Sequence, residues 1–225
     1  MLNYFVRTTN ERQLDKSYNQ INYKKLVDLE HKPVDSFINQ LKIINSFDSV
    51  LLEDDLILCK DFKKKIEEVI NQYPNDIINF FTLPMKYFKT KKEYGFCYNQ
   101  CTYYPKGISN MIANEIEYIL ENDIRYKNCP QYDILEDRAL YNLKIKHIKY
   151  RPCLIQHLDN GSIMNNNVNF CRRSPYFIDY LEELGISYKE ATTKENNNKL
   201  MSLMKEKENV RKEKIKGHSR RYVRN

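Results

Sequence analysis

The chain has 225 residues, of which 41% are hydrophobic and 12% aromatic, so it can bury a core and is too apolar to be intrinsically disordered. No apolar run reaches the length of a membrane span, and the N-terminus lacks the basic and apolar regions of a signal peptide. The six cysteines lack the spacing of a disulfide framework. These features predict a soluble, cytoplasmic domain with reduced thiols.

The net charge of +7 is concentrated at the C-terminus. Residues 194–225 contain eleven Lys and Arg against four Glu, which leaves residues 1–193 neutral. We therefore predict a globular domain over 1–193 and a basic, helical or disordered tail over 194–225. Two interpretations of the tail stay open: it keeps the protein soluble, or it attracts a polyanion such as nucleic acid or an anionic wall polymer.

The first predicted element is a short strand over residues 4–9, which ends in Arg7, Thr8 and Thr9. A cation and two hydroxyls therefore stand between this strand and the polar turn and short helix predicted to follow it. In an open α/β sheet, ligands bind beyond the carboxyl ends of the strands. Arg7 and Thr8 are therefore candidates for contacting a bound nucleotide.

The chain continues as an alternation of strands and helices. Alternation of this kind is typical of a mostly parallel α/β sheet with crossover helices, which is the fold class that we predict. The spacing of apolar residues predicts strands over 23–28, 49–58, 75–81, 101–104 and 146–152, and helices over 33–44, 62–70 (with Asp61 as its N-cap), 109–120, 133–143 and 194–216.

Three adjacent carboxylates interrupt one of the apolar strands. Residues 49–58 read Ser-Val-Leu-Leu-Glu-Asp-Asp-Leu-Ile-Leu, so the strand leads to Glu53, Asp54 and Asp55 before apolar residues resume. Adjacent acids repel one another and lose hydration on burial, so they need a cation or another strong partner. Oxygen ligands suit Mg²⁺ or Mn²⁺, often together with substrate phosphates. We predict a metal site here, with a solvated acidic turn as the alternative.

A second acidic cluster begins the predicted helix over 133–143 and contains Asp133, Glu136 and Asp137. The helix dipole favours acids at this end, so the cluster by itself requires no function.

Cysteines offer one further metal-binding pattern. Cys97, Cys101 and Cys129 supply three potential zinc ligands, but no fourth ligand follows from the spacing. We therefore favour packing of these cysteines in the core.

The acidic stretch resembles the metal motif of GT-A fold glycosyltransferases, in which a hydrophobic strand leads to Glu-Asp-Asp and then to a helix capped by an aromatic residue, here Phe62. The sequence is most similar to the family of the N-acetylglucosaminyltransferase that starts complex N-glycans, with its bacterial and phage relatives. Three further segments match in order: residues 6–15 resemble the first nucleotide-binding strand and helix, 133–140 the segment that supplies a catalytic base, and 152–162 a closing Pro, Gln-His and Ser motif.

The resemblance implies that residues 1–193 form a catalytic domain that moves a sugar from a nucleotide diphosphate to a hydroxyl acceptor. Mn²⁺ or Mg²⁺ would stabilise the leaving diphosphate, and a carboxylate would take the acceptor's proton. The acceptor class stays open and includes polyanions such as DNA with a hydroxylated base. By role, the implied residues are Asp55 and His157 for the metal, Arg7, Thr8, Glu53 and Asp54 for the nucleotide, and Asp137 as the base, with Asp133 and Glu136 as reserve candidates.

Two other classes of function remain. A metal-dependent nuclease also carries acids at the edge of a parallel sheet, but the residues after Asp55 are Leu-Ile-Leu-Cys before Lys60, without a Lys at strand spacing. A non-enzymatic nucleic-acid-binding module, whose acids are only surface charge, predicts neither metal nor nucleotide binding.

Overall fold

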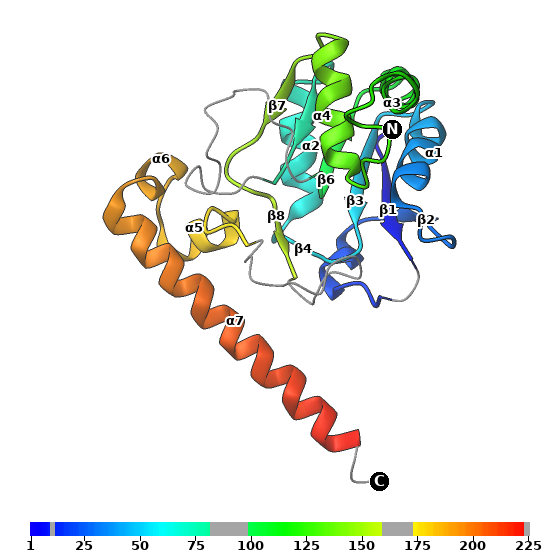
Figure 1. Cartoon of the computed structure of the whole chain (residues 1–225). Helices are drawn as coiled ribbons and strands as arrows, with labels where there is room; N and C mark the ends of the chain where they lie inside the picture. The colour runs from blue at the N-terminus through cyan, green and yellow to red at the C-terminus, as the bar shows by residue number, and fades with distance from the viewer. Residues whose placement is uncertain (10–11, 82–98, 159–172, 223–225) are drawn as a thin grey trace.

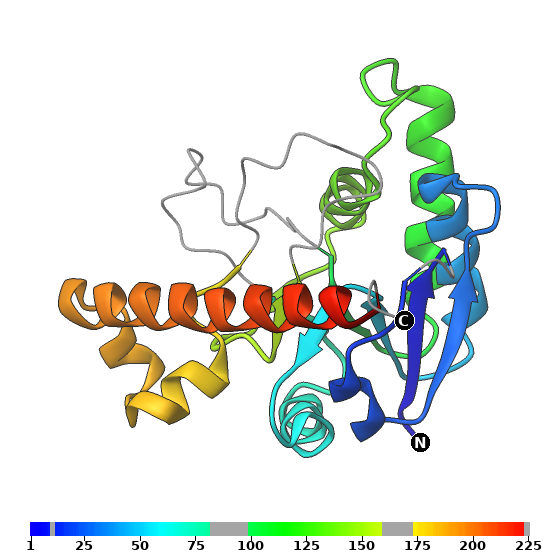
Figure 2. The same ribbon diagram turned by 90° about the horizontal axis from the view of Figure 1, so that it is seen from below.

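The computed structural model describes residues 1–9, 12–81, 99–158 and 173–222. Its centre is a six-stranded sheet with helices on both faces (Figures 1 and 2). Five strands run in one direction and only β6 is antiparallel to its neighbours, which confirms the predicted mostly parallel α/β sheet. In spatial order, the strands are β2 (Tyr23–Val27), β1 (Asn3–Thr8), β3 (Ser49–Glu53), β6 (Cys101–Tyr104), β5 (Ile77–Asn79) and β7 (His147–Lys149).

The helices predicted over 33–44, 62–70, 109–120, 133–143 and 194–216 lie close to those bounds. The short helix expected after the first strand is η1, a 3₁₀ helix, and two helices between residues 178 and 191 were not predicted. In the described part of the chain the helices are η1 (Lys16–Gln20), α1 (Pro33–Ile44), α2 (Phe62–Gln72), α3 (Ser109–Asn122), α4 (Tyr132–Asn142), α5 (Ile178–Leu184), α6 (Tyr188–Ala191) and α7 (Lys194–Tyr222). Each of them is too short or too polar to cross a lipid bilayer.

Alternate residues of the central strands pack into two separate cores, one on each face of the sheet. Phe5 and Leu51 face α1, α3 and α4, whereas Val6 and Leu52 face α2 and the C-terminal helices. A strand that is covered on both faces needs apolar residues at every position. This explains the unbroken Val-Leu-Leu run of β3 that leads to the acids.

The acidic stretch is not a single strand, which corrects the prediction for residues 49–58. β3 ends at Glu53, and the chain bends at Asp54 and Asp55. The following strand β4 (Leu56–Leu58) leaves the main sheet and pairs antiparallel with β8 (Ile155–His157) in a separate two-stranded sheet. The three acids therefore lie at the junction between two sheets, and the register places Leu56 opposite His157.

Helix α2 starts at its predicted residue, but its capping contact differs from the expected one. Asp61 is the N-cap residue, but its backbone is left-handed (φ 56°) and its side chain makes no capping hydrogen bond. Gln20 of η1 replaces it, because its Oε1 accepts a hydrogen bond from Phe62 N (3.0 Å) and its Nε2 donates to Cys59 O (3.0 Å). A contact between distant segments thus provides the cap that local sequence assigns to Asp61.

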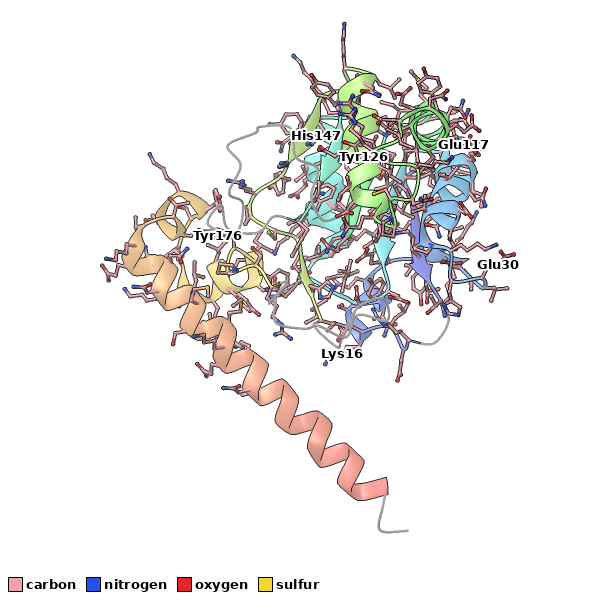
Figure 3. The ribbon with its side chains drawn as sticks, in the orientation of Figure 1. Lys16, Glu30, Glu117, Tyr126, His147 and Tyr176 are labelled. Atoms are coloured by element: carbon pink, nitrogen blue, oxygen red, sulfur yellow. The ribbon has the colours of Figure 1, made fainter. Side chains whose placement is uncertain are left out.

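The first part of α7 belongs to the globular body. Leu200 and Met204 are buried in the core that also contains α5 and α6. Tyr176, which precedes α5, accepts a hydrogen bond from Asn197 Nδ2 (2.7 Å; Figure 3). Beyond these contacts α7 extends away from the sheet (Figure 1). The predicted boundary between 193 and 194 falls at the start of this helix and stays a prediction.

Candidate metal centre

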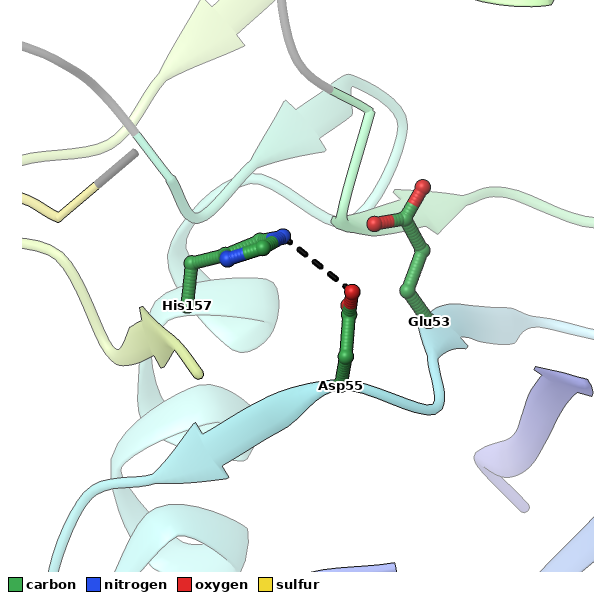
Figure 4. A group of neighbouring side chains, drawn as sticks. All are labelled: Glu53, Asp55 and His157. Atoms are coloured by element: carbon green, nitrogen blue, oxygen red, sulfur yellow. Dashed lines mark ion pairs between the residues drawn. The ribbon is translucent and has the colours of Figure 1, made fainter. Parts of the chain in front are cut away.

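Three metal-ligating side chains meet where the two sheets join (Figure 4). Glu53 ends β3, Asp55 precedes β4, and His157 ends β8. One ligand atom of each residue lies within 4.8 Å of the other two, and no other such group of His, Cys, Asp or Glu occurs among the described residues. The structure thus brings together the two predicted metal ligands, Asp55 and His157, and adds Glu53, for which the sequence predicts a contact with the nucleotide.

Asp55 lies between the other two members of the group. The residue is only 7% exposed, and its Oδ2 lies 3.2 Å from His157 Nε2 and 2.5 Å from Arg12 Nη1. Burial opposes the negative charge, but the contacts with His157 and Arg12 outweigh it and lower the pKa of Asp55 to about 2. The second oxygen, Oδ1, is buried and accepts no hydrogen bond from any described residue. A buried oxygen without a partner is costly, and a bound cation would supply that partner.

The donor set fits a divalent ion of the first transition row. Carboxylate oxygens suit Mg²⁺ and Mn²⁺, whereas an imidazole nitrogen is a ligand of transition ions. Two carboxylates and one histidine therefore suit Mn²⁺ better than Mg²⁺. Glu53, Asp55 and His157 would hold the ion, and Asp55 Oδ1 would offer it an oxygen that accepts no hydrogen bond from the described residues.

Glu53 is held firmly from several sides. Its Oε1 accepts hydrogen bonds from Arg7 Nη2 (3.1 Å) and from the hydroxyl of Tyr132, and its backbone carbonyl accepts one from the hydroxyl of Tyr18. Burial raises the pKa of Glu53, and the nearby charge of Asp55 adds to the increase, although Arg7 opposes it. The two carboxylates thus lie in environments that shift their pKa values in opposite directions.

Arg7 lies inside the protein and organises this end of β1. Its guanidinium lies over the rings of Phe37 and Tyr132, at 5.2 and 4.5 Å from their centroids, and donates to Asn99 O at 2.5 Å as well as to Glu53. Both Arg7 and the adjacent Thr8 are less than one-tenth exposed. These contacts position Glu53, and a direct contact of Arg7 or Thr8 with a nucleotide stays a prediction.

Arg12 lies at the acidic cluster, although the sequence predicts no role for it there. Its Nη1 contacts both Asp55 Oδ2 (2.5 Å) and Asp54 Oδ1 (3.4 Å), and its side chain is 21% exposed. Asp54 is buried beside the metal group but is not a member of it. The signal that could have found Arg12 is the need of adjacent buried acids for a counter-charge, since Arg12 is the next arginine after Arg7 beyond the predicted strand.

The segment η1 fixes the chain that carries the acids. Besides the hydrogen bond from Tyr18 to Glu53 O, the hydroxyl of Ser17 accepts a hydrogen bond from Leu58 N (2.9 Å). Gln20 holds the following residues at the start of α2. The bend at Asp54 and Asp55 is therefore supported by side chains on both sides of it.

The three acids of α4 lie in unequal environments. Glu136 is completely buried and accepts hydrogen bonds from Tyr104 Oη (2.6 Å) and Asn99 Nδ2, and its burial raises its pKa to about 8. An acceptor hydroxyl therefore cannot reach it without rearrangement of the core. Asp133 and Asp137 are partly exposed and stay candidates for the base.

The cysteine pattern forms no metal group in the described ranges. Cys101 is fully buried in β6 and Cys129 lies between α3 and α4, while Cys97 falls outside the described residues. Ser162 of the closing motif also falls outside them.

Comparisons with known proteins give no match: no protein-family model matches the chain, and no curated protein matches its sequence. A function must therefore be inferred from the site itself.

Proposed function

We propose that this protein is a metal-dependent glycosyltransferase that moves a sugar from a nucleotide diphosphate to a hydroxyl acceptor. The observation that carries the proposal is the group of Glu53, Asp55 and His157, with a buried oxygen of Asp55 that lacks a hydrogen-bond partner among the described residues. The group adjoins the carboxyl end of β3, next to that of β1, where open α/β sheets bind their ligands. The mostly parallel sheet supports the GT-A identity that we propose for the fold.

The residues of the site have separate tasks in this reaction. When bound, a divalent ion would neutralise the charge that develops on the leaving diphosphate. Arg7 and Tyr132 hold Glu53 in one orientation through their hydrogen bonds to its Oε1. A ligand that is fixed before substrate arrives needs little reorganisation during the reaction. The rigid surroundings of Glu53 therefore favour a catalytic site over a solvated acidic turn.

The direct test of this proposal is thermal unfolding with a panel of nucleotide sugars, with and without Mn²⁺. A ligand that binds only the folded state raises the melting temperature. We expect at least one nucleotide sugar to do so in the presence of Mn²⁺ and not in its absence. Cleavage of DNA with Mn²⁺ and no response to any nucleotide sugar would favour the nuclease instead.

Asp137→Ala is expected to lower turnover by about 100-fold or more while the affinity for the donor changes little, because a general base acts on the attacking hydroxyl and not on the donor. The measurement is the release of nucleoside diphosphate under saturating donor, with the donor dissociation constant from calorimetry. Glu121→Ala, which removes an exposed acid at the end of α3, is the matched control. Full turnover in Asp137→Ala together with loss in Asp133→Ala would move the role of base to Asp133.

The basic tail supports a polyanionic acceptor. Residues 209–225 carry seven Lys and Arg against one Glu. A truncation after Glu208 removes this charge and keeps the buried Leu200 and Met204, together with the ion pair between Lys207 and Glu183 (2.8 Å). The fold should therefore survive the cut.

We expect this truncation to weaken binding to a DNA duplex strongly at low salt and little at high salt. Each lost phosphate contact should flatten the slope of log affinity against log salt by about 0.9. Fluorescence anisotropy over a salt series measures this slope for the full-length and truncated proteins, and an anionic wall polymer serves as the second polyanion. Parallel slopes for both proteins would leave the tail with a solubilising role only.

A further inference from the structure

Arg12 contacts two of the three adjacent acids. Its Nη1 contacts Asp55 Oδ2, the same oxygen that lies 3.2 Å from His157 Nε2, and it also reaches Asp54 Oδ1. Asp55 Oδ1 is buried and has no hydrogen-bond partner among the described residues. One oxygen of Asp55 therefore contacts Arg12 and His157, whereas the other has no hydrogen-bond partner in the described part of the chain.

A guanidinium and a divalent ion cannot share these carboxylates without a cost. Arginine stays charged at every physiological pH, and two cations a few ångströms apart in a partly buried site repel each other strongly. Arg12 and a metal ion therefore compete for the same negative charge.

The two arginines of the site differ in their exposure to solvent. The side chain of Arg7 is 9% exposed, lies over two aromatic rings and donates to Glu53 and Asn99 O. The side chain of Arg12 is 21% exposed and lies in the segment between β1 and η1. Of the two arginines, Arg12 is therefore the one nearer to solvent, and it is the one that contacts Asp54 and Asp55.

We propose that Arg12 is an internal counter-ion, which neutralises Asp54 and Asp55 while the metal is absent and withdraws when the metal binds. The inference rests on the metal site of the proposed function. Its consequence is that Arg12 stabilises the metal-free protein and at the same time weakens metal binding. A residue with a purely structural role would not have these opposite effects.

The test is the Mn²⁺ affinity of the full-length protein without nucleotide, measured by the loss of the electron paramagnetic resonance signal of free Mn²⁺. We expect Arg12→Gln to bind Mn²⁺ about tenfold more tightly than wild type, and its metal-free form to unfold at a lower temperature. Arg12→Lys keeps the charge and should lie between the two. Arg12→Met keeps the aliphatic stem and replaces Arg12→Gln if that variant does not fold.

Two control variants test whether a change in Mn²⁺ affinity arises from the contact between Arg12 and the acids. Arg125→Gln makes the same change in net charge at an exposed ion pair with Asp123, between α3 and α4, and should bind Mn²⁺ like wild type. Asp55→Asn in the Arg12→Gln background should remove the tight binding, because it removes the ligand.

The possible results separate this inference from the proposed function. Equal or weaker Mn²⁺ affinity in Arg12→Gln, in a site that Asp55→Asn abolishes, would overturn the role of Arg12 and leave the metal site standing. Absence of Mn²⁺ binding from wild type and from all Arg12 variants would overturn both. Tighter binding in Arg12→Gln and in Arg125→Gln alike would reduce the effect to net charge and would also overturn the inference.

Discussion

Asp55→Asn is expected to abolish Mn²⁺-dependent binding of nucleotide sugars while the protein stays folded. The substitution is nearly isosteric, but it removes the charge of the central ligand and puts an amide where Asp55 now meets His157 and Arg12. Changes to groups that only support a metal ligand already cost about 10- to 100-fold in affinity, so loss of a ligand should cost at least about 100-fold. Calorimetry with Mn²⁺ and the nucleotide sugar found by thermal unfolding measures the effect.

The matched control for this prediction is Asp76→Asn, which makes the same change at a partly exposed residue before β5. It should leave the metal-dependent affinity unchanged, and circular dichroism should show both variants folded. An unchanged affinity in Asp55→Asn would contradict the assignment of the metal site.

The stability of the protein is expected to fall as the pH rises from about 5 to about 9, because Glu136 is buried in its neutral form. The pKa of Glu136 is about 8 in the folded protein and has an ordinary value of 4.5 in the unfolded chain. Between these values the folded state holds a proton that the unfolded state has lost, so stability decreases with pH. The contribution of neutral Glu136 to the free energy of unfolding is fully present below pH 4.5 and is lost above pH 8. A shift of this size corresponds to at most about 5 kcal/mol.

Glu136→Gln tests this effect, since glutamine has nearly the same shape and does not titrate. Urea unfolding at pH 5, 7 and 9 gives the free energy of unfolding for both proteins. We expect the wild type to lose several kcal/mol relative to Glu136→Gln across this range, because ionisation in the core must displace the protein towards the unfolded state. Parallel pH profiles would show that Glu136 is ionised in the folded protein at neutral pH.

Local sequence patterns were sufficient for the five longest helices and for most strands, but α5 and α6 were not predicted. Pro33 and the apolar spacing after it predict α1 at its observed bounds, and the apolar run before Glu53 predicts β3. The pattern could not show that the strand breaks at Asp54, because apolar residues stand on both sides of the acids. The break depends on the pairing of β4 with β8, about 100 residues later in the chain. The reversed direction of β6 likewise depends on its partners and not on its own residues.

The residues of the candidate site were likewise only partly predictable from the sequence. The carboxylates of Glu53 and Asp55 could be proposed from their position after an apolar strand, and His157 followed from a resemblance. Arg12 could not be assigned, because its partners lie more than 40 residues away and its own surroundings in the sequence read as a polar turn. Nor could helical spacing distinguish the buried Glu136 from the partly exposed Asp133 and Asp137, since the helix dipole favours all acids at that end.

The split of the acidic stretch would give a bound metal ion a mechanical role. Glu53 belongs to the six-stranded sheet, whereas His157 belongs to the two-stranded sheet, and Asp55 stands between them. An ion bound by all three residues would cross-link the two sheets and close a chain loop of about 100 residues. Binding of the ion would then be linked to the rigidity of the β4–β8 sheet, which would be least rigid without the ion and would become more rigid as the ion binds. Under the proposed function, ion binding would therefore both prepare the donor site and fix the surface offered to an acceptor.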